Sequence, residues 1–266
     1  MIERLNFYDI YGYLIPGMSW LVLVWLPFGL VGKNWLPAEL SSALMALVLG
    51  YLVGHVLQRL AEQALPSTKK DASDRLRYPS DVLLDDQNNT FSREVKSRLE
   101  HRILIYFDID VRNGRNPDPE VLKKRHQDAF MLCRRTLIQK GVASYAEQFE
   151  GMYVLMRGVM AACILAAAYY LGWALNGILP PSFIVILALG LILLTGKTKE
   201  VFWLLGVFLF ILGDLFGSGR ATSLETSFLF LGMCVASVFI SIVCCIASQQ
   251  FSHKFAETGY RDFCAL

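Results

Sequence analysis

The sequence predicts an all-α, polytopic membrane protein in which a helical cytoplasmic insert separates the second membrane span from the third. Hydrophobic residues make up 55% of the 266 residues and charged residues only 18%, whereas soluble domains carry about 25% charged residues. The apolar residues fall into five or six separate runs. Between Arg59 and Glu150 lie 17 of the 25 Lys and Arg residues and 15 of the 23 Asp and Glu residues.

The apolar runs give the spans in chain order. A membrane-spanning helix needs about 20 mostly apolar residues. Four runs near that length and two shorter ones occupy residues 11–31, 40–57, 153–175, 178–195, 201–217 and 227–248. The two short runs are separated by the polar residues 196–200. We therefore expect about six spans, with four full spans and one re-entrant hairpin as the alternative.

Lysine and arginine residues orient the chain, because short cytoplasmic loops carry an excess of both. With Met1 inside, 22 of the 25 basic residues lie on the cytoplasmic side. We therefore expect both termini and the insert to be cytoplasmic. The predicted domains are a transmembrane hairpin at 1–58, a cytoplasmic helical domain at 59–150, a transmembrane bundle at 151–250 and a cytoplasmic tail at 251–266.

Two helices are expected within the insert. The first starts at Thr90 or Ser92, and its apolar residues recur at the three- to four-residue spacing of an amphipathic helix; they are Val95, Leu99, Ile103 and Tyr106. The second opens at Asp118, where a capping side chain is followed by proline and an acid in the first turn. It runs toward Lys140, before Gly141 interrupts it.

Two ionisable residues lie near the same cytoplasmic level of the spans. Asp9 precedes the first span, and Arg157 lies about one turn into the third. Ionisable groups at this depth are costly unless they are paired, hydrated or able to reach the interface. We predict an ion pair between Asp9 and Arg157, serving as a structural clasp or as part of a gate. The alternative is that Arg157 reaches the interface without a partner.

Glycine spacing predicts close helix contacts. Gly50 and Gly54 form a G-x-x-x-G motif, and Gly213 and Gly217 repeat the spacing. This motif lets two helix backbones approach closely. It leaves open whether the partner helix belongs to the same chain or to a second copy in a homo-oligomer, which is the assembly that we expect.

A basic face is predicted on the second insert helix. Its residues are Lys123, Lys124, Arg125, Arg134 and Arg135. Such a face attracts anionic lipid headgroups, and a cytoplasmic protein partner, a nucleotide or RNA are further candidate ligands. A solvated helix surface is the alternative.

No pattern in the sequence predicts catalysis. There is no phosphate-binding glycine loop, no H-E-x-x-H and no G-x-S-x-G motif. The six cysteines contain no C-x-x-C pair, so neither a zinc site nor a disulfide framework is supported. We expect a protein that is not an enzyme, with no catalytic residue, no cofactor and no metal.

Four short segments carry a resemblance to a group of proteins. Residues 7–17 read FYDIYGYLIPG, residues 79–84 read PSDVLL, Phe149 and Tyr153 precede Arg157, and residues 260–263 read YRDF. The chain thereby resembles uncharacterised bacterial multi-spanning membrane proteins with a YDxxGYxxPG-like signature. Those proteins are similar to membrane components of anti-phage defence systems. The resemblance implies that the chain is a component of a bacterial inner membrane that senses or disrupts the envelope.

These observations favour a membrane protein whose cytoplasmic domain senses a signal or partner. That domain would control the assembly or opening of the membrane part, as in an anti-phage defence effector that forms a pore. The first alternative is a membrane anchor or scaffold for a soluble partner. The second is a component of a small-solute channel or transporter, which the scarcity of polar residues in the middle of the spans disfavours.

Overall fold

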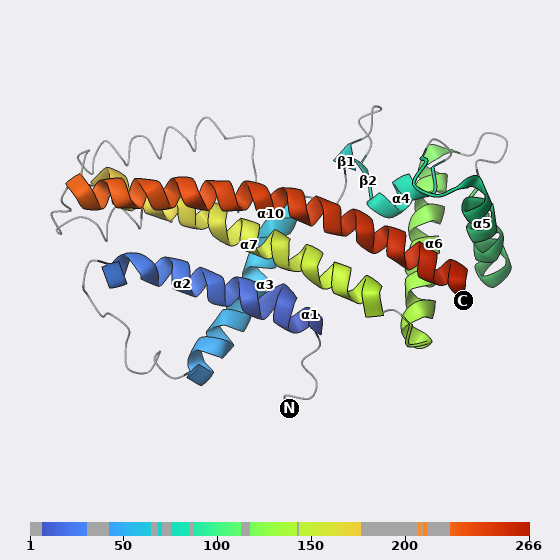
Figure 1. Cartoon of the computed structure of the whole chain (residues 1–266), viewed down its shortest axis with the longest axis horizontal. Coiled ribbons are helices and arrows are strands. Elements are labelled where there is room, and N and C mark those ends of the chain that lie inside the picture. Colours follow the sequence, from blue (N-terminus) through green and yellow to red (C-terminus); the bar gives the residue numbers. More distant parts are fainter. Residues whose placement is uncertain are drawn as a thin grey trace. The chain divides into compact units, whose positions relative to one another are not determined.

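The computed structural model describes most of the chain as helix (Figure 1). The described residues are 7–30, 43–64, 69–70, 76–85, 88–112, 118–142, 144–176, 207–208, 210–211 and 224–266. They belong to two compact units. Unit 1 combines Met1–Leu65 with Val154–Ser248, and unit 2 combines Pro66–Tyr153 with Gln249–Leu266.

Four helices within the described residues are long and apolar enough to cross a membrane. They cover Ile10–Leu30, Ala43–Glu62, Tyr145–Leu175 and Glu225–Ala265. The two shorter apolar runs, at 178–195 and 201–217, lie almost wholly outside the described residues. The structure therefore gives a helical protein with four candidate spans, and the prediction of six spans stays a prediction.

Unit 1 begins with three consecutive helical segments, α1 (Phe7–Asp9), η2 (Ile10–Leu14) and α2 (Ile15–Leu30). Next comes α3 (Ala43–Ala64), and the unit also holds the apolar parts of α7 (Ser144–Asn176) and α10 (Leu224–Ala265). Its core is formed by large side chains that pack against the small residues of α7. The indole ring of Trp173 is wholly buried and packs against Phe28 and Phe230, with ring centroids 5.6 and 5.3 Å away.

Unit 2 contains the helices predicted for the insert and a two-stranded antiparallel pair, β1 (Lys69–Lys70) and β2 (Leu76–Arg77), in which Lys69 pairs with Arg77. Its helices are α4 (Pro79–Leu83), α5 (Arg93–Phe107) and α6 (Pro119–Gln139). The helix starts are confirmed at two caps. Ser92 Oγ accepts from the N–H of Val95 at 3.4 Å, and Asp118 Oδ1 accepts from the N–H of Glu120 at 3.1 Å.

The core of unit 2 is built partly from the C-terminal end of the chain. Leu99 and Ile103 of α5 are buried as the apolar stripe predicts, whereas Val95 and Tyr106 are exposed. Tyr260 and Phe263 of α10 complete this core, and the hydroxyl of Tyr260 donates to the carbonyl of Ser80 at 3.4 Å. Hydropathy alone separates residues 251–266 as a tail. In the structure residues 251–265 are the last turns of α10, and the whole segment belongs to unit 2.

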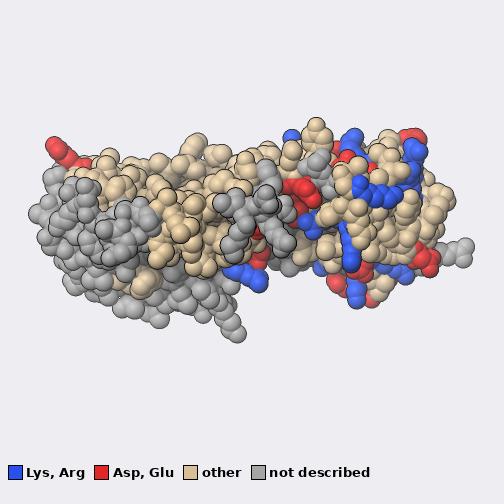
Figure 2. Space-filling view, turned by 90° about the horizontal axis from the view of Figure 1, so that it is seen from below, with Lys and Arg blue, Asp and Glu red and all other residues tan. Residues whose placement is uncertain are grey.

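The charged side chains are unevenly distributed over the described surface. Figure 2 shows Lys, Arg, Asp and Glu gathered on one part of the molecule, while much of the described remainder is uncharged. In α10 the exposed apolar side chains are numerous, and Phe228, Val235 and Phe239 are each more than 60% exposed. Such continuous apolar exposure fits a helix whose solvent is lipid.

Candidate functional site

The first long helix departs from α-helical geometry near Pro16. In η2, Ile10–Leu14, the chain is π-helical, and the N–H of Ile15 donates to the carbonyl of Ile10. Proline has no N–H, so Pro16 cannot donate to the carbonyl of Gly12, four residues before it. Single π-helical turns inside longer helices are frequent at functional sites. The backbone oxygen of Gly12 therefore lacks its usual α-helical donor.

The helices η2 and α2 cross α3 with their backbones in contact. A Cβ atom on Gly54 would overlap the carbonyl group of Tyr13, and one on Gly17 would overlap the carbonyl oxygen of Gly50. Each overlap involves main-chain atoms, which cannot rotate away. The G-x-x-x-G pair of α3 therefore packs against a helix of the same chain. Gly213 and Gly217 lie outside the described residues.

A third helix, α7, joins the crossing at Gly158. A Cβ atom there would lie 2.8 Å from Cγ of Pro16 and would overlap the side-chain amide of Gln58. Because Gly158 has no side chain, the side chain of Gln58 can occupy the space next to it. Three helical segments, η2 with α2, α3 and α7, meet at this point.

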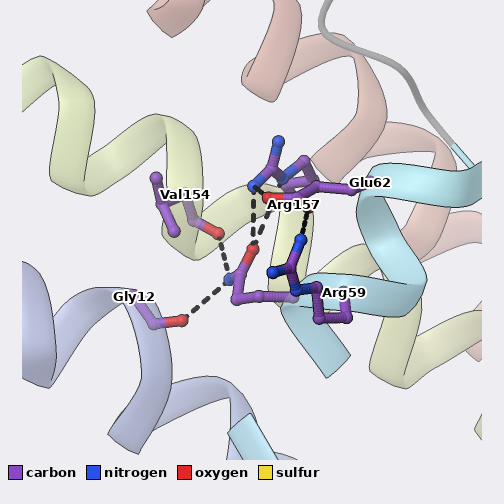
Figure 3. Close-up of polar contacts among 6 residues, drawn as sticks. Gly12, Arg59, Glu62, Val154 and Arg157 are labelled. Carbon is purple, nitrogen blue, oxygen red and sulfur yellow. Dashed lines mark hydrogen bonds and ion pairs between the residues drawn. The ribbon is translucent and has the colours of Figure 1, made fainter. Parts of the chain in front are cut away.

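The side chain of Gln58 links all three segments (Figure 3). Its Nε2 donates to the carbonyl oxygens of Gly12 and Val154, each at 2.8 Å. Its Oε1 accepts from Nε and Nη2 of Arg157, each at 3.3 Å. Gln58 is 4% exposed, and unpaired polar groups in an apolar interior cost several kcal/mol each. The amide thus replaces the missing donor of Gly12 and also orients Arg157.

Arg157 is a buried cation with an acidic partner. It is 6% exposed, and its Nη2 donates to Oε1 of Glu62 at 3.2 Å. Glu62 also pairs with the exposed Arg59 at 3.3 Å. Figure 3 shows Arg157 and Glu62 directed toward one another. We call Gln58, Glu62 and Arg157 the polar crossing.

Among the described residues of unit 1, charged side chains converge at the polar crossing. The described residues of this unit include five charged side chains, Asp9, Arg59, Glu62, Arg157 and Glu225. Glu62 and Arg157 belong to the polar crossing, and Arg59 pairs with Glu62 beside it. Charged groups inside membrane spans are rare and mark functional sites by default. This convergence makes the polar crossing the candidate functional site of unit 1.

The prediction for this site identified Arg157 and missed the partners described above. Gln58 and Glu62 lie four residues apart on α3, so both face the same side of the helix. That spacing, at the end of a span level with Arg157, is the signal that could have found them. Asp9 ends α1 and is close enough to Tyr51 to act on it electrostatically. The predicted Asp9–Arg157 ion pair stays a prediction.

Aromatic rings border the same helix crossing. The rings of Tyr13 and His55 stack with centroids 3.7 Å apart, and Tyr51 contacts the His55 ring edge-on at 4.7 Å. Tyr8 extends the group, with its ring centroid 5.7 Å from that of Tyr13. These contacts hold η2 against α3 one turn from the polar crossing.

The predicted basic face lies on α6 in unit 2, but its members differ in their contacts. Lys124, Arg125 and Arg135 are exposed, and Arg125 donates to the carbonyl of Asp110 at 3.3 Å. Lys123 and Lys124 line an open hollow that also holds two acids, Glu120 and Asp128. The surface is therefore of mixed charge.

Arg134 belongs to a junction between α6 and the two helices that unit 2 shares with unit 1. Its Nη2 donates to Oε2 of Glu150 on α7 at 2.6 Å, and its guanidinium lies 5.8 Å from the ring centroid of Phe255 on α10. Nearby, Phe149 of α7 stacks on Phe251 of α10 at 6.4 Å. These contacts tie α6 to α7 and α10 within unit 2.

Two buried groups of unit 2 have perturbed acidity. Burial raises the pKa of the Asp81 carboxyl, although the N–H of Tyr78 donates to it at 3.0 Å. Burial likewise raises the pKa of the Cys133 thiol. Both side chains are fully buried, so their neutral forms are favoured over the ionised ones.

Comparisons with protein-family models, curated proteins and solved structures found no match. Among the described residues, no group of three or more His, Cys, Asp or Glu side chains is arranged to hold a metal ion. The six cysteines are free thiols.

Proposed function

We propose that the chain is a signal-responsive membrane protein, in which unit 2 receives a ligand or partner and unit 1 responds at the polar crossing. One observation carries this proposal: α7 and α10 each run without interruption through both units. Residues 144–153 of α7 and 249–265 of α10 belong to unit 2, and the remainder of each helix belongs to unit 1.

Helix length supports this division. At 1.5 Å per residue, the 33 residues of α7 extend about 50 Å and the 42 residues of α10 about 63 Å. The hydrocarbon core of a bilayer is only about 30 Å thick. Each helix therefore has a surplus that must leave the membrane. Because helical hydrogen bonds keep a helix stiff along its axis, a shift imposed on the surplus moves the embedded part as well.

The polar crossing is the responding element in this proposal. Arg157 lies on α7, whereas its two partners, Gln58 and Glu62, lie on α3. A slide or rotation of α7 against α3 would break these hydrogen bonds together. The buried cation would then need a new partner or water. Such an arrangement favours two discrete states over a continuous range.

The proposed output is permeabilisation of the membrane or assembly of copies within it. The exposed apolar surface of α10 supports contact with lipid or with a second copy. The resemblance to membrane components of anti-phage defence systems favours permeabilisation as the biological role. The proposal includes a bacterial inner membrane, with both termini and unit 2 in the cytoplasm, because the Lys and Arg distribution favours that orientation.

Dye release from liposomes containing the full chain tests this function. The Glu150→Arg variant breaks the pair with Arg134 in unit 2, and the double variant R134E/E150R restores an opposite-charge pair. Loss of about 1 kcal/mol at this pair corresponds to about a fivefold change in an equilibrium. We expect the release rate to change about fivefold in Glu150→Arg and to return toward the original rate in the double variant.

A matched control uses an ion pair in unit 2 that does not involve α7 or α10. Glu100 of α5 pairs with Arg112 at 3.2 Å, and Glu100→Arg should leave the release rate unchanged. Equal effects of Glu100→Arg and Glu150→Arg would contradict transmission through the shared helices. Absence of release from every variant would contradict permeabilisation as the output.

An anchor for a soluble partner is the second candidate, because unit 2 has a hydrophobic core of its own. In that case unit 1 would only hold unit 2 at the membrane. Replacing the spans with unrelated ones would preserve partner capture, and Glu150→Arg would leave unit 1 unaffected.

A further inference from the structure

Unit 2 contains a pocket of about 380 Å³ between four of its helices. Phe130 and Met131 of α6 form one wall, and Tyr153 of α7 forms another. Ser252 and Phe255 of α10 face them, and the start of α4 closes one end. The pocket therefore contacts both helices that continue into unit 1.

The lining of this pocket is free of charge. None of its ten residues is Asp, Glu, Lys, Arg or His, although the insert holds 32 charged residues between Arg59 and Glu150. Aromatic rings dominate, and those of Phe130 and Phe255 meet edge-to-face at 5.5 Å. Polar atoms are few, and Gln127 and Ser252 contribute some of them.

This chemistry selects the kind of ligand. Binding pockets are commonly about 300–1,000 Å³, mostly apolar, with a few polar groups that fix orientation. At about 30 Å³ for a water-sized group, 380 Å³ holds roughly a dozen non-hydrogen atoms. An ionised ligand would lose its hydration without gaining an opposite charge. The neighbouring hollow with Lys123, Lys124, Glu120 and Asp128 offers the opposite, ionic chemistry.

We propose that this pocket binds an uncharged, mainly apolar molecule of about a dozen non-hydrogen atoms that carries one or two hydrogen-bonding groups. A free small molecule and the end of a lipid acyl chain share this chemistry. Binding of this ligand does not depend on the function proposed above. The further idea that the bound ligand is the input signal rests on that proposed function. The contacts with α6, α7 and α10 are the route by which occupancy would act.

Photolabelling of the full chain in nanodiscs tests the proposal with two matched probes. Benzophenone is uncharged and contains 14 non-hydrogen atoms, and 4-benzoylbenzoate adds a carboxylate to the same rings. Excited benzophenone inserts into C–H bonds beside sulfur, so Met131, which is 59% exposed, reports the pocket. Met45 of α3 is 47% exposed on a candidate span and reports simple partition into lipid.

We expect benzophenone to label Met131 saturably, with half-saturation between roughly 10 µM and 1 mM for a ligand of this size. Met45 should be labelled in linear proportion to the probe. The carboxylate probe should not label Met131 saturably. Ser252→Phe, which fills the pocket, should reduce labelling of Met131 about tenfold, whereas Ser252→Ala should preserve it.

Competition on the unaltered chain keeps the test decisive if Ser252→Phe does not fold. An excess of 1-decanol added from water should abolish the saturable labelling of Met131 if the ligand is a free molecule. Competition by added phospholipid alone would identify an acyl chain as the occupant and would also support the proposal. Labelling of Met131 that does not saturate, that resists both competitors, or that is equal for the two probes would overturn it.

Discussion

Replacing Gln58 with Met removes the side chain that links three helical segments while keeping a similar length and shape. The amide makes four hydrogen bonds, to the carbonyls of Gly12 and Val154 and with two nitrogens of Arg157. Met supplies neither the donor nor the acceptor. Arg157 would keep its ion pair with Glu62 but would lose the neutral acceptor that orients it.

The expected cost follows from hydrogen bonds measured in membrane helices. Such bonds contribute about 0.6 kcal/mol on average and about 1.7 kcal/mol at most. Four bonds of average strength give a loss of about 2–3 kcal/mol in the free energy of unfolding. A double-mutant cycle with Arg157→Met should show coupling of at least about 1 kcal/mol, because the two side chains are in direct contact.

The loss in the free energy of unfolding can be measured by unfolding the full chain in mixed micelles with increasing amounts of a denaturing detergent. Intrinsic tryptophan fluorescence reports unit 1, which contains all five tryptophans of the chain, the buried Trp173 among them. Gln148→Met is the control, because Gln148 is exposed on α7. A loss below about 0.5 kcal/mol in Gln58→Met, the usual size of a surface substitution, would refute the structural role of the polar crossing.

Three further predictions concern single positions. Gly54→Ala should destabilise unit 1 by more than about 2 kcal/mol because its Cβ would overlap the Tyr13 carbonyl. At Gly232 an added Cβ would have nothing within 4 Å, so Gly232→Ala should instead stabilise α10 by up to about 1 kcal/mol. Thermal melting compares the two variants, and equal effects on the melting temperature would contradict the close contact between η2 and α3. Because burial raises the pKa of Asp81, the folded state binds a proton more tightly than the unfolded chain, and this contribution to stability is lost as pH rises through the folded pKa. Asp81→Asn should therefore be more stable than the original chain at pH 7, with a gap that closes toward pH 4; a gap that widens on acidification would be the contrary result. Cys133 should resist N-ethylmaleimide at pH 7.5 until unit 2 unfolds, because its buried thiol has a raised pKa; mass spectrometry of the peptide that contains Cys133, separate from the other five free thiols, would reveal early modification.

The sequence predicts the four long helices well because their apolar length is a direct requirement of the bilayer. It fails at the end of α10 for a physical reason. Hydropathy falls after Ser248, where polar residues such as Ser252 and Lys254 appear. Polar residues mark the end of the hydrocarbon, but they do not stop a helix. Packing of Tyr260 into unit 2, which hydropathy does not register, accompanies continuation of the helix to Ala265.

The candidate site was predictable only in part. Arg157 and the Gly50–Gly54 spacing are conspicuous in apolar surroundings, so the sequence singles them out. Gln58 is different, because its partners lie 46 to 99 residues away along the chain. The four-residue spacing of Gln58 and Glu62 indicates a shared helix face, but it does not reveal the distant partners of Gln58. Its role becomes visible only when the missing N–H of Pro16 and the absent side chain of Gly158 are seen beside it.

Hydrogen–deuterium exchange of the full chain in nanodiscs tests most directly whether unit 2 acts on unit 1. The measurement compares the original chain with Glu150→Arg and with the control Glu100→Arg. We expect Glu150→Arg to raise deuterium uptake in peptides covering residues 7–17 and 50–62, which form the helix crossing, and the control to leave them unchanged. Increased uptake confined to peptides of unit 2 would contradict transmission through α7 and α10.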